Sequence, residues 1–343
     1  MSFGNDFLWG AATSSYQIEG ASSRRARCVW DDFCETEGKV KHGDHGNIAC
    51  EHLDHMDGDV ALMRRLGLKA YRFSIAWARV LPDGETVNEE GLDTYDRLVD
   101  LLLDAGIRPF VTLYHWDHPS VLEDRGGWRS PESPAWFERL ADVVAGRLHD
   151  RVHDWMTINE PQVFLGLGLD QGTHAPGRTC EIAEVIRASH HVLCAHGRGA
   201  QAIRRYDDHA RIGWAPVGVV AYPSTPNDIE AARERTFSIR ADNVWNNTWF
   251  NDPVVFGHYP EDGLTRFGSM LPDGFETDLK QIRQPLSFYG VNIYHGGEVT
   301  VVDGETREVR YPVGGGRTQM DWPITPEALY RGPRFFYERY GLP

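Results

Sequence analysis

Short apolar runs alternate with amphipathic helical stretches along most of the chain. Runs that are apolar at nearly every position are expected where both faces of a strand are covered. Strands are predicted over Phe7–Ala12, Ala70–Ile75, Pro109–Tyr114, Asp154–Asn159, Arg211–Pro216 and Phe288–Asn292. Helices are predicted over Met56–Leu66, Leu92–Ala105, Pro134–Leu148, Ile182–Tyr206 and Thr325–Tyr340. This alternation of strand and helix indicates βα units around a parallel sheet.

The pattern predicts an α/β fold of the (β/α)8 TIM-barrel type, with about six βα units present in this chain. A complete barrel of this type has eight strands, and its edges stay unpaired until it closes. We therefore expect residues 1–343 to form a single barrel domain that is incomplete at its C-terminal end.

One segment breaks the alternation. Glu298–Val302 and Arg307–Tyr311 read as two strands, and Asp303-Gly304 between them is a two-residue type I′ turn signal. The sequence therefore predicts a β-hairpin excursion over residues 297–312, in the loop after the sixth strand.

Composition removes several classes of function. The chain has 50 acidic and 35 basic residues and a net charge of −15, so it repels phosphate backbones and no nucleic-acid partner is expected. No stretch is long and apolar enough for a membrane span. The five cysteines follow no zinc or redox spacing, and we interpret them as reduced thiols of a cytoplasmic protein.

Candidate chemistry gathers at the ends of the predicted strands, where barrel active sites lie. The fourth strand ends in Asn159-Glu160-Pro161. A carboxyl group held away from water has a raised pKa and can donate a proton near neutral pH. The alternative is a carboxylate that stabilises a helix N-terminus, and Asn-Glu-Pro alone leaves both interpretations open.

The ends of the first and third strands carry groups suited to a sugar. His115 can hydrogen-bond a hydroxyl while Trp116 packs at the pocket wall, and Gln17 offers a donor and an acceptor to two adjacent hydroxyls. The competing interpretations are a structural histidine and an exposed loop glutamine.

The second and sixth strands add an arginine, an amide and a phenol. Arg72 lies inside an apolar strand, which predicts an acidic partner at the centre of the barrel. Strand alternation points Asn292 and Tyr294 in the same direction.

Together these motifs, in this order, resemble the family-1 glycoside hydrolases, the β-glucosidase group, from residue 7 to the last residue. The resemblance rests on residues 7–20, Tyr71-Arg72-Phe73-Ser74-Ile75, Tyr114-His115-Trp116, Thr157-Ile158-Asn159-Glu160-Pro161, His174-Ala175-Pro176-Gly177 and Asn292-Ile293-Tyr294. It implies that Glu160 is the general acid/base and that Arg72 and Tyr294 orient the nucleophile. The substrate-binding residues it implies are Gln17, His115, Trp116, Asn159, Asn292, Tyr294 and Trp322, the last on the leaving-group side.

The implied reaction is retaining hydrolysis of small-molecule β-glycosides or oligosaccharides by O-glycosyl bond cleavage, without metal or cofactor. The family's nucleophile lies in a Thr-Glu-Asn-Gly motif on strand seven, and the sequence contains no Glu-Asn-Gly. We therefore expect the 343-residue chain alone to have little activity. Two departures from the family pattern are Gln162, where tryptophan is common, and the arginine-rich stretch 22–27.

Two other functions stay open. The first is a non-catalytic sugar-binding or assembly protein, whose barrel is completed by a second copy or a complementing C-terminal fragment. The second is an inverting glycosidase that pairs Glu160 with another carboxylate such as Asp117 or Glu298.

Overall fold

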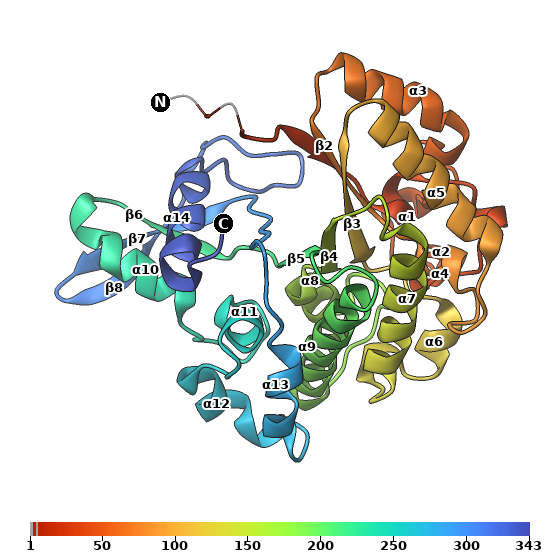
Figure 1. Ribbon diagram of the computed structural model, residues 1–343. Helices are drawn as coiled ribbons and strands as arrows, with labels where there is room; N and C mark the ends of the chain where they lie inside the picture. The colour runs from red at the N-terminus through yellow and green to blue at the C-terminus, as the bar shows by residue number, and fades with distance from the viewer. Residues whose placement is uncertain (1–2, 5) are drawn as a thin grey trace.

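The computed structural model describes residues 3, 4 and 6–343, and its centre is a five-stranded parallel sheet (Figure 1). The strands lie in chain order and are β1 (Gly10–Ala12), β2 (Ala70–Ser74), β3 (Arg108–Tyr114), β4 (Asp154–Asn159) and β5 (Arg211–Ala215). All five fall on predicted strands, and β4 has the predicted bounds. The parallel barrel-type sheet is therefore confirmed.

The long helices connect successive strands and cover the outside of the sheet (Figure 1). They are α3 (His52–Arg65), α5 (Glu89–Asp104), α7 (Ser133–Leu148) and α9 (Ile182–Arg204). Shorter helices are α1 (Ser15–Ile18), α2 (Val29–Glu35), α4 (Trp77–Val80), α6 (Ser120–Asp124) and α8 (Pro161–Leu165). Fully buried Trp155 and Trp214, on β4 and β5, belong to the core between these layers. No helix of the described residues is long and apolar enough to cross a membrane.

The predicted sixth strand, Phe288–Asn292, is not a regular strand. The segment does lie beside β5, because Gly290 N donates to Trp214 O at 3.0 Å and Asn292 N donates to Pro216 O at 3.0 Å. Proline has no N–H to donate in return, so the ladder is interrupted at Pro216. Only an isolated parallel bridge, Val217 to Asn292, remains.

A second, three-stranded sheet stands apart from the barrel sheet (Figure 1). β7 (Gly296–Val302) and β8 (Glu305–Val309) pair antiparallel around Asp303-Gly304, both with positive φ. β6 (Val220–Pro223), which the sequence did not predict, pairs parallel with β7. Between β6 and residue 288 lie α10 (Ile229–Phe237), α11 (Thr248–Val255), α12 (Glu261–Phe267) and α13 (Leu279–Ile282). Together with α14 (Glu327–Tyr340), α10 packs on this sheet.

Gly213 provides a test of how segment 288–292 is held. A Cβ at this β5 position would lie 2.3 Å from Cε2 of Phe288, the ring that packs against Phe110. Gly213→Ala is therefore expected to destabilise the fold by about 1–3 kcal/mol, measured as a lower urea midpoint. In the control, Gly58→Ala, the new Cβ meets nothing within 4 Å in α3, so about 0.5–1 kcal/mol of stabilisation is expected. An unchanged midpoint for Gly213→Ala would contradict this packing.

Candidate active site

Glu160 lies immediately after β4, and its backbone is held in the left-handed region with φ 46°. Its N–H donates to Ala215 O of β5 at 2.8 Å, which fixes the residue at the end of the sheet. Trp116, just after β3, is also left-handed with φ 78°. This conformation costs free energy for residues other than glycine and is concentrated at functional sites.

The Glu160 side chain is 2% exposed and faces the segment after residue 288. Its Oε1 accepts hydrogen bonds from Asn292 Nδ2 at 2.7 Å and from the Tyr294 hydroxyl at 3.0 Å. Although Glu160 is the N-cap residue of α8, its side chain makes no capping bond. The helix-terminus interpretation is therefore wrong for this carboxyl group.

Burial raises the pKa of Glu160 above its usual range, while the hydrogen bonds from Asn292 and Tyr294 and the charge of Arg72 lower it in part. Tyr294 is itself affected, since burial and the nearby carboxylate raise the pKa of its phenol and keep it a hydrogen-bond donor. A carboxyl group in this setting is biased toward its protonated form.

Asn159 is fully buried and connects four of the expected site residues. Its Oδ1 accepts from Arg72 Nη2 at 2.5 Å and from Asn292 Nδ2 at 2.9 Å. Its backbone oxygen accepts from Trp116 Nε1 at 2.8 Å, and its Nδ2 lies 3.4 Å from His115 Nε2. The structure thus brings together residues from β2, the β3 end, the β4 end and segment 288–292.

Arg72 has no acidic partner among the described residues, so the predicted ion pair is wrong for this chain. The guanidinium donates to neutral acceptors: Thr112 Oγ1 at 2.8 Å and Asn159 Oδ1, with Asn292 Oδ1 at 3.5 Å. Burial lowers the pKa of Arg72 to about 10. The positive charge therefore lies at the strand ends with no carboxylate bonded to it.

A cavity of about 370 Å³ opens beside this cluster. It is lined by Gln17, His115 and Trp116, together with residues that were not predicted as site residues: Tyr16, Trp30, His45 and His174. The Trp30 and His174 rings meet at 5.6 Å. Burial and the Arg72 charge lower the pKa of His115 to about 3, so this ring is neutral at pH 7. Tyr16 belongs to the motif over residues 7–20, whereas Trp30 lies in none of the motifs that carry the family resemblance.

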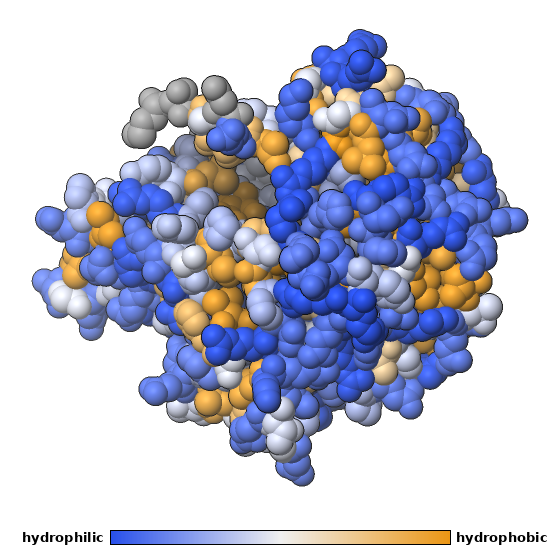
Figure 2. All heavy atoms as spheres, in the orientation of Figure 1, coloured by the Kyte–Doolittle hydropathy of each residue, from blue (hydrophilic) through white to orange (hydrophobic). Residues whose placement is uncertain are grey.

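Trp322 contacts the ring of Tyr294. Their rings are 5.1 Å apart, and Trp322 also lies 5.8 Å from the His295 ring. Tyr294 is 54% exposed. Figure 2 shows this face of the molecule hollowed between α14 and the barrel helices, with apolar residues deep in the hollow.

The remaining sequence candidates lie outside this cluster. Asp117 Oδ2 accepts from Ser15 Oγ at 2.6 Å, and burial raises the pKa of Asp117 to about 7. Glu298 accepts from Ser224 in the smaller sheet. Gln162 is fully buried and donates to Val217 O and Asn246 O, so it supports the loop after β5. Asp117 and Glu298 are thus each bound to a serine outside the Glu160 cluster, and an inverting pair with Glu160 stays a hypothesis.

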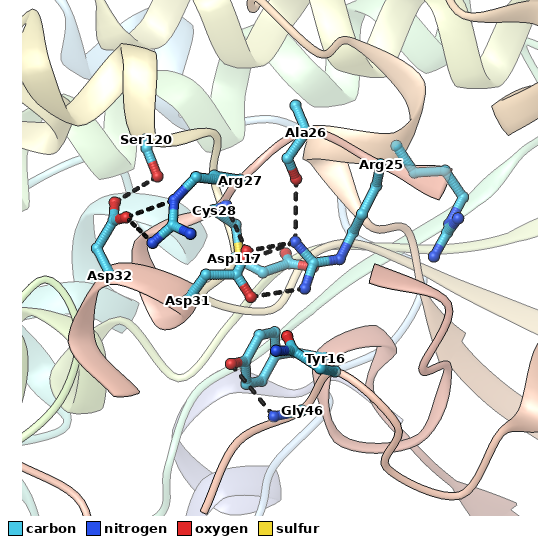
Figure 3. Close-up of polar contacts among 12 residues, drawn as sticks. Tyr16, Arg25, Ala26, Arg27, Cys28, Asp31, Asp32, Gly46, Asp117 and Ser120 are labelled. Atoms are coloured by element: carbon cyan, nitrogen blue, oxygen red, sulfur yellow. Dashed lines mark hydrogen bonds and ion pairs between the residues drawn. The ribbon is translucent and has the colours of Figure 1, made fainter. Parts of the chain in front are cut away.

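The arginine-rich stretch 22–27 is neutralised locally (Figure 3). Arg25 binds both oxygens of Asp31, at 2.5 and 2.8 Å, and Arg27 binds Asp32. Both carboxylates belong to α2. These pairs attach the stretch to α2, which carries the Trp30 wall of the cavity.

Comparison with known proteins agrees with this geometry. The model of glycosyl hydrolase family 1 matches residues 1–343. The chain belongs to that family. It is 37% identical to β-glucosidase A of Thermotoga maritima, covering 99% of the chain and 76% of the relative. It is 38% identical to β-glucosidase A of Acetivibrio thermocellus, covering 100% of the chain and 77% of the relative.

A solved structure, β-glucosidase from Thermotoga maritima in complex with deoxynojirimycin, superposes with a TM-score of 0.87 at 37% identity. The match covers 99% of this chain and 76% of that one. The chain is accordingly a glycoside hydrolase of the β-glucosidase type with a TIM-barrel architecture, and the activity of its class is hydrolysis of β-linked glycosides with retention.

The buried carboxyl group gives a pH-dependent prediction. Because the pKa of Glu160 is raised in the folded state, protonation stabilises the fold at low pH, and this contribution is lost as pH rises through the folded-state pKa. Glu160→Gln is expected to raise the melting temperature at pH 7 and to change it less at pH 4. The exposed control Glu305→Gln should leave melting unchanged at both values. A destabilised Glu160→Gln variant at pH 7 would contradict the assignment.

Proposed function

We propose that Glu160 is the general acid/base of a retaining β-glucosidase site in which Gln17, His115, Trp116, Asn159 and Asn292 bind the glycone. The observation that carries this proposal is the buried Glu160 carboxyl at the end of β4, held through Oε1 alone. No described residue hydrogen-bonds Oε2, so this oxygen is available to carry the proton toward a glycosidic oxygen.

Arg72 and Tyr294 are proposed to orient the attacking carboxylate of the reaction. A partly buried guanidinium bound only to neutral oxygens is destabilised by the loss of water, so an anion beside it is favoured. The Tyr294 hydroxyl donates to Glu160 Oε1 at 3.0 Å, and Tyr294 is partly exposed. Both groups are suited to a second carboxylate across the sugar, about 5–5.5 Å from the first.

The cavity lined by Gln17, His115 and Trp116 supports a sugar as the ligand. A pyranose presents polar edges to the amide and the neutral imidazole and an apolar C–H face to the indole. Trp322, whose ring is tilted by 46° against that of Tyr294, is proposed to line the leaving-group side. The relatives are named β-glucosidases, which favours glucose as the glycone.

The proposed reaction takes two displacements. A carboxylate attacks the anomeric carbon, the bond to the leaving oxygen breaks, and that oxygen takes the proton from Glu160. Glu160 then removes a proton from water, whose oxygen attacks the anomeric carbon and releases the enzyme carboxylate.

The open edge of the sheet supports a proposal about partners. All three residues of β1 are exposed, and among the residues that the structure describes β1 pairs only with β2. Unpaired edge strands favour association, so a complementing fragment or a second copy is proposed to cover β1. Sedimentation combined with intact mass tests this proposal, since a monomer with the mass of 343 residues would contradict it.

A cytoplasmic location is also proposed. The five cysteines are free thiols, as is usual for proteins of a reducing compartment.

The first functional prediction concerns turnover. A polypeptide of these 343 residues is expected to release 4-nitrophenol from 4-nitrophenyl β-glucoside at a negligible rate. Among the described residues, Glu160 is the one carboxylate in the cluster with Arg72 and Tyr294, so no second carboxylate is in place to attack the sugar. The release rate is measured on material whose intact mass is verified. Robust turnover with retention by that material would contradict the role given to Arg72 and Tyr294.

The second concerns binding. His115→Ala is expected to weaken binding of glucoimidazole, a ligand of the Thermotoga maritima enzyme, by roughly tenfold through loss of one hydrogen bond. The dissociation constant is measured by calorimetry. The matched control is His209→Ala, because the His209 side chain is 94% exposed. Equal affinities for the two variants would contradict a sugar contact at His115.

A further inference from the structure

The helix α9 carries two side chains, His190 and Cys194, one turn apart on a buried face. A third group, Asp278, reaches them from the residue before α13, 84 positions further along the chain from Cys194. One donor atom of each residue, His190 Nε2, Cys194 Sγ and a carboxylate oxygen of Asp278, lies within 4.8 Å of the other two.

We propose that His190, Cys194 and Asp278 form a binding site for a divalent transition metal, with zinc as the best-fitting ion. Imidazole nitrogen, thiolate sulfur and carboxylate oxygen are the three ligand types that zinc takes in proteins. The site is distinct from the Glu160 cluster and does not depend on the proposed function.

The two donor separations that involve His190 fit a tetrahedral ion. Ligand distances of zinc imply edges of about 3.5 Å between nitrogen and sulfur and about 3.4 Å between nitrogen and oxygen. The corresponding separations are 3.6 Å from His190 Nε2 to Cys194 Sγ and 3.1 Å from His190 Nε2 to Asp278 Oδ2. An ion can therefore enter with small side-chain shifts.

The surroundings also suit a metal. The other His190 nitrogen, Nδ1, lies 2.9 Å from the hydroxyl of buried Tyr259, which fixes the ring as outer partners of metal-bound histidines do. His190 and Cys194 are buried, whereas the Asp278 side chain is 45% exposed. Solvent thus reaches the carboxylate, which leaves an entry route and a fourth position for water.

The competing explanation is a hydrogen bond between His190 and Asp278 with Cys194 as a packing neighbour. That explanation leaves the sulfur with a weak hydrogen bond to His190 Nε2 at 3.6 Å and no contact with Asp278. A bound ion would use all three, would displace the thiol proton to solvent, and would tie α9 to the 275–282 segment.

The test is a titration of the full chain, freed of metal by a chelator, with cobalt(II) as the spectroscopic probe. We expect one equivalent to bind with a sulfur-to-cobalt charge-transfer band in the near ultraviolet, and zinc to displace it and raise the melting temperature. Cys194→Ser should abolish the band. The matched control, Cys50→Ser, removes an exposed thiol and should keep it.

Asp278→Asn provides a second variant that keeps an oxygen for His190 and lies at the surface, so folding is not at risk. A loss of cobalt affinity of tenfold or more in Asp278→Asn supports the site. The proposal would be overturned if the wild-type chain showed no charge-transfer band, or if the band persisted in folded Cys194→Ser. An Asp278→Asn variant that binds cobalt as tightly as the wild type would overturn it too.

Discussion

The active-site cluster depends on the placement of one positive charge, the Arg72 guanidinium, among neutral acceptors. Its bond to Asn159 Oδ1 turns that amide so that the same oxygen also receives Asn292. Asn292 in turn holds Glu160. Because each group binds the next, the position of the Glu160 carboxyl is linked to a cation on β2.

The sheet and the segment beside it contribute differently to this cluster. Arg72, Asn159 and Glu160 lie on or directly after regular strands, and the left-handed backbone of Glu160 is enforced by its bond to β5. Asn292 and Tyr294 come from a segment without a regular ladder. The Glu160 carboxyl is thus placed by regular strands, while its hydrogen-bond donors come from a less regular segment.

Much of this arrangement could be predicted from sequence, because parallel strands buried on both faces are apolar throughout and their ends share one edge. β4 was predicted with its bounds, and Glu160, Asn159, His115 and Asn292 do lie together. The prediction of an acidic partner for Arg72 was wrong, since amide and hydroxyl oxygens accept its hydrogen bonds instead.

Other features carry no local signal. β6 has four residues and pairs with a strand more than seventy positions away, so it resembles any short apolar run. Whether Pro216 interrupts a hydrogen-bond ladder depends on which segment lies beside it in the fold, and the local sequence does not show this. The same holds for His190, Cys194 and Asp278, whose proximity arises from helix packing and not from cysteine spacing.

The proline at position 216 also has a consequence for local opening of the fold. Segment 287–292 donates amide protons to residues 212–216 and receives one bond in return, from Gly218 N to Asn292 O at 2.8 Å. Pro216 has no N–H to donate, so the return bond expected at this position is missing. Regions with fewer backbone bonds open at lower free-energy cost than the surrounding sheet. Amide exchange at Gly290 and Asn292 would then report sub-global fluctuations that momentarily release Glu160 while β2 to β4 stay closed.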